Sequence, residues 1–128
     1  MAAKKILLID DDDALVEAYR TVLESAGYAV ATAPDARAGL AATRKSAPDL
    51  IVLDVMMESA TAGIDLARGL RADGKLAKVK ILMITSVSQK TGLDVGSSAG
   101  DDFLPVDSFL EKPVDPRRMI EEVKALLG

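Results

Sequence analysis

Short runs of branched apolar residues, with no polar residues alternating between them, recur along the chain. Three of them are followed at once by a residue that can bind metal or phosphate: residues 6–9 by Asp10 and Asp11, residues 50–53 by Asp54, and residues 81–84 by Thr85. Such runs are typical of strands buried on both faces, as in a parallel sheet between two layers of helices. Ligands bind outside the carboxyl ends of the strands in such sheets, so we expect these acids and the hydroxyl to share one crevice.

A fourth candidate is Lys112, which follows a weaker apolar stretch at Phe109 and Leu110. With the three acids and the hydroxyl, it completes a set of side chains suited to magnesium-assisted phosphoryl chemistry. The pattern therefore predicts a phosphoryl-binding site at the carboxyl edge of a sheet.

Stretches of helical periodicity separate the apolar runs. The expected strands cover residues 4–10, 28–33, a segment introduced by Pro48 that ends at Asp54, and 79–84; the expected helices cover about 13–26, 34–46, 64–72 and 115–127. Gly27 marks the end of the first helix, and Asp115 with Pro116 marks the beginning of the last. Helical crossovers keep successive strands parallel, so the chain is expected to be an α/β protein.

The glycine-rich stretch at about 86–108 interrupts this rhythm. It contains Gly92, Gly96 and Gly100 and few residues that favour helices. We expect a short helix inside a long loop there, which is either a partner surface or disordered.

Composition narrows the possible functions. The chain has 128 residues and 49% hydrophobic content, enough for a single domain. It has no cysteine and no histidine, so any metal must be bound by oxygen. A net charge of -4 without a clustered basic run argues against nucleic acid as a partner. The sequence also lacks a signal peptide and an apolar span, which predicts a cytoplasmic protein with no membrane contact.

Four sequence blocks, in order along the chain, resemble the receiver domains of two-component response regulators. They are residues 9–11, residues 53–57, Thr85 with Ser86, and Lys112 with Pro113, and the resemblance extends from about Lys4 to Leu127. It implies a flavodoxin-like, doubly wound, five-stranded parallel sheet of strand order 2-1-3-4-5. The resemblance also suggests a stand-alone receiver spanning residues 1–128, without an output domain.

The same resemblance implies a role for each candidate residue. Asp54 would be the nucleophile that takes a phosphoryl group from a sensor histidine kinase or a histidine phosphotransfer protein. Mg²⁺ would be held by Asp10, Asp11, Asp54 and the backbone carbonyl of Met56. The remaining positions would bind the phosphoryl group or report its presence: Thr85, Ser86, Lys112 and Phe109. The protein would be a phosphoacceptor and not a turnover enzyme, acting on an unknown downstream partner.

Departures from the family pattern leave alternatives open. Glu58 stands where a proline is common, and the apolar Met56 and Val87 cannot orient an attacking water, which predicts a slowly hydrolysing phosphoryl group. A haloacid-dehalogenase-type phosphatase would use similar residues, but it places a second acid two positions after its nucleophile, where this chain has Met56. The protein could also be a phosphorelay intermediate, a phosphate sink or a degenerate interaction module.

Overall fold

The computed structural model describes residues 4–55, 68–73, 78–86, 107–112 and 114–127. For a few of these positions only the backbone is described: residues 36, 54, 55, 85, 86, 109 and 112. The predicted irregular region at 86–108 and most of the predicted helix at 64–72 therefore lie outside the described residues. The last part of that helix, residues 68–72, is helical as expected.

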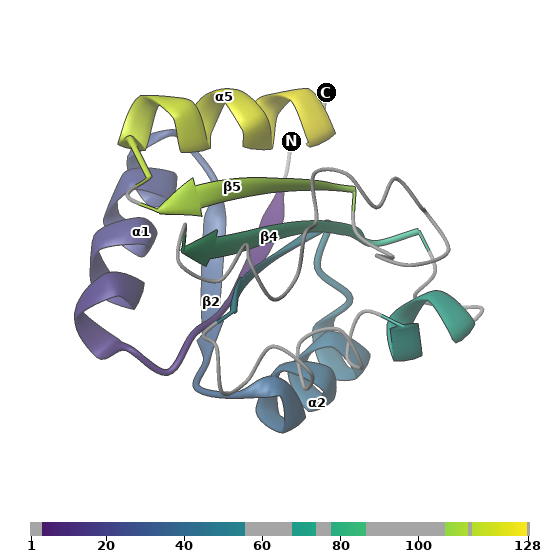
Figure 1. Ribbon diagram of the computed structural model, residues 1–128. Coiled ribbons are helices and arrows are strands. Elements are labelled where there is room, and N and C mark those ends of the chain that lie inside the picture. Colours follow the sequence, from purple (N-terminus) through teal and green to yellow (C-terminus); the bar gives the residue numbers. More distant parts are fainter. Residues whose placement is uncertain (1–3, 56–67, 74–77, 87–106, 113, 128) are drawn as a thin grey trace.

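A parallel five-stranded sheet forms the centre of the molecule (Figure 1). Its strands are β1 (Lys5–Ile9), β2 (Ala29–Ala33), β3 (Leu50–Val55), β4 (Lys80–Ser86) and β5 (Ser108–Lys112). They lie in the order β2-β1-β3-β4-β5, and every neighbouring pair is parallel. This confirms the predicted flavodoxin-like fold class.

Helices cover both faces of this sheet (Figure 1). They are α1 (Asp13–Ser25), α2 (Ala36–Ser46) and α5 (Pro116–Leu127). Tyr19 and Leu23 of α1 pack with Met119 and Val123 of α5 over one face. The other face is covered by α2 together with Leu70 from the short helical segment at 68–72.

Buried side chains of the strands alternate between the two faces. Leu7, Ile51 and Ile81 belong to the layer under α2, whereas their neighbours Leu8 and Leu82 belong to the layer under α1 and α5. This period of two is the geometry of a strand, and continuous apolar runs are needed because both faces are buried.

Local signals in the sequence set most of the helix boundaries. Asp12 caps α1 by accepting hydrogen bonds from the backbone N–H groups of Ala14 and Leu15, at 3.0 and 3.2 Å. Gly27 follows the end of α1 with a φ of +100°, a backbone conformation that residues with a side chain rarely adopt. Asp35 and Asp115 accept equivalent hydrogen bonds at the starts of α2 and α5.

The strands that carry the candidate site extend further than their apolar runs. We expected strands ending at Asp54 and Ile84, but β3 continues to Val55 and β4 to Ser86. Backbone pairing continues in register through these polar residues, which apolar patterning cannot reveal. Thr85 and Ser86 therefore lie within a strand and not after it.

In the part of the chain that the structure describes, no helix has the length and apolar character needed to cross a membrane.

Candidate functional site

The carboxyl ends of β1 and β3 bring the predicted acids to one edge of the sheet. Ile9 of β1 is in register with Leu53 of β3, so the next residues lie at the same level: Asp10 just after β1, and Asp54 as the last residue but one of β3. Neighbouring strands are about 4.8 Å apart. The backbone thus places the acids from the first and third strands side by side, as the sequence predicted.

The next two strands add the other candidates to the same edge. Asp54 pairs with Ile84 of β4, so Thr85 lies one residue beyond it on the neighbouring strand. Ser86 in turn pairs with Lys112 of β5. Lys112 is therefore two strands, or about 10 Å, from the strand of Asp54.

Asp10 and Asp11 occupy contrasting environments although they are neighbours in sequence. Asp10 is 5% exposed, its backbone N–H donates to the carbonyl of Ala33 at 3.1 Å, and its Oδ1 accepts from the N–H of Asp12 at 2.9 Å. Asp11 is exposed. One acid is thus fixed in the protein while the other faces solvent, where a hydrated cation can reach it.

Asp12 and Asp13 continue the acidic run with a structural role. Asp12 is the N-cap of α1, and Asp13 is in its first turn, where the positive end of the helix dipole stabilises negative charge. Capping and the helix dipole are sufficient to explain both acids. The N–H of Asp12 also orients Asp10, a contact between near neighbours that sequence reasoning missed.

Other parts of the predicted site are placed by backbone alone or not at all. The side chains of Asp54, Thr85, Ser86, Phe109 and Lys112 are not described, and Met56 lies outside the described residues. The roles assigned to these residues therefore stay predictions.

The chemistry of the donors at this edge fits magnesium. The acids at the ends of β1 and β3 offer only carboxylate oxygen, and Mg²⁺ prefers a few carboxylates with its remaining positions filled by water. Three carboxylates gathered at adjacent strand ends also repel one another, and a divalent cation relieves that repulsion.

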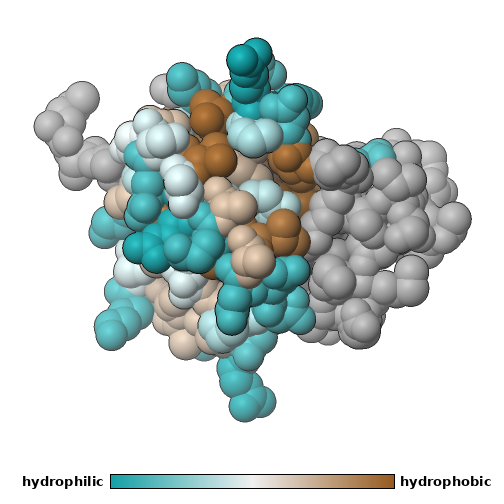
Figure 2. Space-filling model, turned by 90° about the vertical axis from the view of Figure 1, so that its left-hand side faces the viewer, coloured by the Kyte–Doolittle hydropathy of each residue, from teal (hydrophilic) through white to brown (hydrophobic). Residues whose placement is uncertain are grey.

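An apolar groove of about 480 Å³ lies beside this edge, between α1 and the first turn of α5. Its walls are formed by the apolar residues Leu15, Ala18, Tyr19, Val22, Val114, Pro116 and Met119. Figure 2 shows hydrophobic side chains gathered among hydrophilic ones on this side of the molecule. Leu15 and Val22 are half-exposed at the groove, and Leu15 also packs against the buried cluster that contains Tyr19 and Leu23.

Away from the site, a hydrogen bond joins β5 to α5. The hydroxyl of Ser108 donates to Oε1 of Glu122 at 2.5 Å, and this bond lowers the pKa of the Glu122 carboxyl from its ordinary value. Arg118 adds to the effect through an ion pair at 2.8 Å.

A known family of domains matches almost the whole chain. A family model described as the response regulator receiver domain matches residues 6–124. The chain belongs to this family. The receiver domain is a component of two-component signalling systems, and the match favours this class over the phosphatase alternative.

Curated relatives of this receiver domain include two transcriptional regulators. It is 34% identical over 131 residues to the phosphate regulon transcriptional regulatory protein PhoB of Pseudomonas aeruginosa, covering 99% of this chain and 53% of the relative. It is 37% identical over 123 residues to the DNA-binding dual master transcriptional regulator RpaA of Synechocystis, covering 96% and 48%. The chain spans about half the length of these relatives.

Solved structures show the same fold. The receiver domain superimposes on the chemotaxis response regulator CheY4 of Vibrio cholerae with a TM-score of 0.81 at 28% identity, covering 98% of this chain and 100% of that one. A CheY-like receiver domain protein from Methanospirillum hungatei gives a TM-score of 0.81 at 27% identity, with coverage of 98% and 94%.

Proposed function

We propose that Asp54 of this receiver domain accepts a phosphoryl group from a phosphohistidine and that the modification changes how the protein binds a partner. The proposal depends mainly on one observation, the register that sets Asp10 and Asp54 at adjacent strand ends with Thr85 and Lys112 on the next two strands. The donor would be a sensor histidine kinase or a histidine phosphotransfer protein, in the cytoplasm.

The transfer balances as a single displacement. A carboxylate oxygen of Asp54 attacks phosphorus, a P–O bond forms as the P–N bond breaks, and the imidazole nitrogen leaves with the electron pair. The hydroxyl of Thr85 would donate a hydrogen bond to a phosphoryl oxygen, and the ammonium of Lys112 would form an ion pair with another. Ser86 is small and would leave room for the incoming group.

Mg²⁺ would be held by Asp11 directly, by Asp10 through water, by Asp54 and by the carbonyl of Met56. When bound, the ion neutralises charge on the transferring phosphoryl group. Asp10 is suited to an orienting role because it is buried and accepts a hydrogen bond from the N–H of Asp12.

The added charge would act by shifting a pre-existing equilibrium between two arrangements of the domain. Thr85 would move toward the phosphoryl group, and Phe109 would turn inward to fill the space. The downstream partner is unknown, and a role as phosphorelay intermediate or phosphate sink is the second candidate. Adding a phosphotransfer protein to the phosphorylated domain would distinguish a relay, because only a relay passes the group on.

Intact mass spectrometry after incubation with acetyl phosphate and magnesium tests the central claim. We expect the parent protein to gain one phosphoryl group and Asp54→Asn to gain none. Asp49→Asn is a matched control, because Asp49 precedes the same strand at its other end, where its carboxylate accepts a hydrogen bond from the N–H of Lys5 at 2.8 Å. Phosphorylation of Asp54→Asn, or its loss in Asp49→Asn, would contradict the assignment.

A further inference from the structure

Six exposed cations gather at the edge of the sheet opposite the predicted site. We call them the amino-edge cluster: Lys4 and Lys5 at the start of β1, Arg44 and Lys45 in the last turn of α2, and Lys78 and Lys80 at the start of β4. Parallel strands begin at one common edge, so these three pairs come together although 76 positions separate the first residue from the last.

Backbone hydrogen bonds connect the segments that carry the cluster. The N–H of Asp49 donates to the carbonyl of Lys5 at 2.9 Å, and the N–H of Lys80 donates to the carbonyl of Asp49 at 3.2 Å. Helix α2 ends at Ser46, only three residues before Asp49, so its last turn lies at the same edge. Lys5 and Lys80 are two strands apart, which is about 10 Å.

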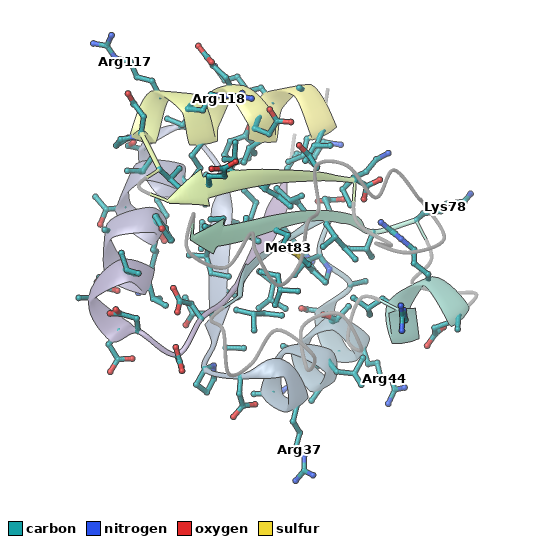
Figure 3. The ribbon with its side chains drawn as sticks, viewed as in Figure 1. Arg37, Arg44, Lys78, Met83, Arg117 and Arg118 are labelled. Atoms are coloured by element: carbon teal, nitrogen blue, oxygen red, sulfur yellow. The ribbon has the colours of Figure 1, made fainter. Side chains whose placement is uncertain are left out.

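Few acids oppose these cations in the described part of this edge. Asp107 is occupied, because its carboxylate forms an ion pair with Arg71 at 2.5 Å and accepts a hydrogen bond from the N–H of Ile81 at 2.8 Å. Glu24 in the last turn of α1 and Glu122 beside Ser108 also lie at this edge, and they form ion pairs with Arg20 and Arg118. Asp49 and Asp73 add two further negative charges, against the six positive charges of the cluster. Figure 3 shows Arg44 and Lys78 pointing outward on this side, whereas Arg37 extends from the other end of α2.

We propose that the amino-edge cluster binds the phosphate backbone of double-stranded nucleic acid. A duplex carries about one negative charge per 1.7 Å of its axis, counted over both strands, so about six charges fall within 10 Å of its length. The cluster carries six cations on segments that begin about 10 Å apart, so the two surfaces are complementary in charge. Five of the six cations are lysines, which contact phosphate as point charges and read no sequence.

The overall charge of -4 does not prevent this contact, because the acids are concentrated elsewhere. Asp10, Asp11, Asp12 and Asp13 all follow β1 at the opposite edge. A duplex lying across the start of the strands would have the whole length of the strands between it and this acidic run. The proposal does not depend on phosphorylation of Asp54.

Fluorescence anisotropy with a labelled DNA duplex of arbitrary sequence provides the test. Six cations opposed by two acids give a net of about four phosphate contacts. The logarithm of the binding constant should fall with the logarithm of the salt concentration with a slope of about -0.9 per contact, so affinity should fall roughly 150-fold between 50 and 200 mM salt. Lys45→Glu combined with Lys80→Glu should abolish binding at 50 mM salt. The matched control is Arg37→Glu combined with Arg117→Glu, which changes net charge equally at exposed positions outside the cluster.

The outcomes separate the proposal from its rivals. If the variant with Lys45→Glu and Lys80→Glu loses DNA binding while the control double variant keeps it, the result supports a localised site. Equal losses in both pairs would show a response to net charge only and would overturn the proposal, as would absence of binding at 50 mM salt. Tighter binding of polyglutamate than of DNA would also overturn it, in favour of an acidic protein partner. Far-UV circular dichroism and urea unfolding of both double variants should match the parent, which verifies that a loss of binding is not a loss of fold.

Discussion

Replacing Gly39 by alanine tests how closely α2 approaches the sheet beneath the predicted site. A Cβ atom at position 39 would lie 2.3 Å from Cδ1 and 2.9 Å from Cγ1 of Ile9, and real Cβ atoms essentially never come within 3.0 Å of another atom. Ile9 is 3% exposed and directly precedes Asp10, so it has little space into which to turn. Either the Ile9 side chain must leave its present rotamer in a packed core, or the helix and the strand must move apart.

Two opposing effects determine how much Gly39→Ala changes the free energy of unfolding. Overpacking a core costs about 1–3 kcal/mol, whereas alanine in place of glycine in a helix gains about 1 kcal/mol. The clash involves two atoms of a fully packed side chain, which favours the upper part of the range. We therefore expect Gly39→Ala to lower the free energy of unfolding by about 1–2 kcal/mol.

Urea unfolding at constant m-value measures this change, and Gly69→Ala is the matched control. Gly69 also lies in a helical segment, but a Cβ there would meet nothing within 4 Å. That variant should gain about 0.5–1 kcal/mol. Equal gains at both positions would refute the argument, because they would show that α2 does not press on Ile9.

A second substitution identifies the atoms responsible. Ile9→Val removes Cδ1, the nearer of the two contacting atoms, at a cost of about 1 kcal/mol on its own. When Ile9→Val is already present, Gly39→Ala should cost much less than it does in the parent. Simple additivity of the two changes would show that the clash lies elsewhere.

Three further predictions follow from contacts described above. Asp12→Ala should destabilise the domain by about 1 kcal/mol in urea while Asp12→Asn, which keeps an acceptor for the first turn of α1, should not; equal effects would exclude capping as the cause. The Ser108–Glu122 bond depresses the pKa of the Glu122 carboxyl, so its stabilising effect is complete above the ordinary value of 4.5 and is lost as pH falls through the lower folded value. Ser108→Ala should therefore raise the pKa of Glu122 in an NMR titration and weaken the acid dependence of stability, and an unchanged pKa would contradict the assigned cause. Met56→Asn should shorten the lifetime of the phosphoryl group on Asp54, followed by mass spectrometry, because an amide can orient water; no change would reject the slow-hydrolysis hypothesis.

The core of the fold was predictable because its signals are local. Apolar runs, such as residues 50–53, form strands that are buried on both faces, and Gly27 ends α1 where expected. Strand order, by contrast, came from family resemblance, since periodicity alone does not say which strands pair. The ends of β3 and β4 were misjudged because their last residues are paired although they extend past the apolar runs.

Features made by distant residues could not be read from the sequence. Arg71 and Asp107 are 36 positions apart, and Gly39 contacts Ile9 only after α2 packs under β1. The amino-edge cluster was missed for the same reason, because its cations occur in pairs that only the sheet brings together. The candidate acids were found because each directly follows a predictable apolar run.

The central position of β3 has a consequence for how the domain responds to chemistry at its end. It has hydrogen-bonded neighbours on both sides, β1 and β4, and residues 50–53 are almost inaccessible. Its amide protons should exchange with deuterium only through opening of the whole domain, whereas those of the outer strand β2 have a shorter route. Asp54 thus lies in a strand that does not open without its neighbours, so a covalent change there must be accommodated by movement of neighbouring segments.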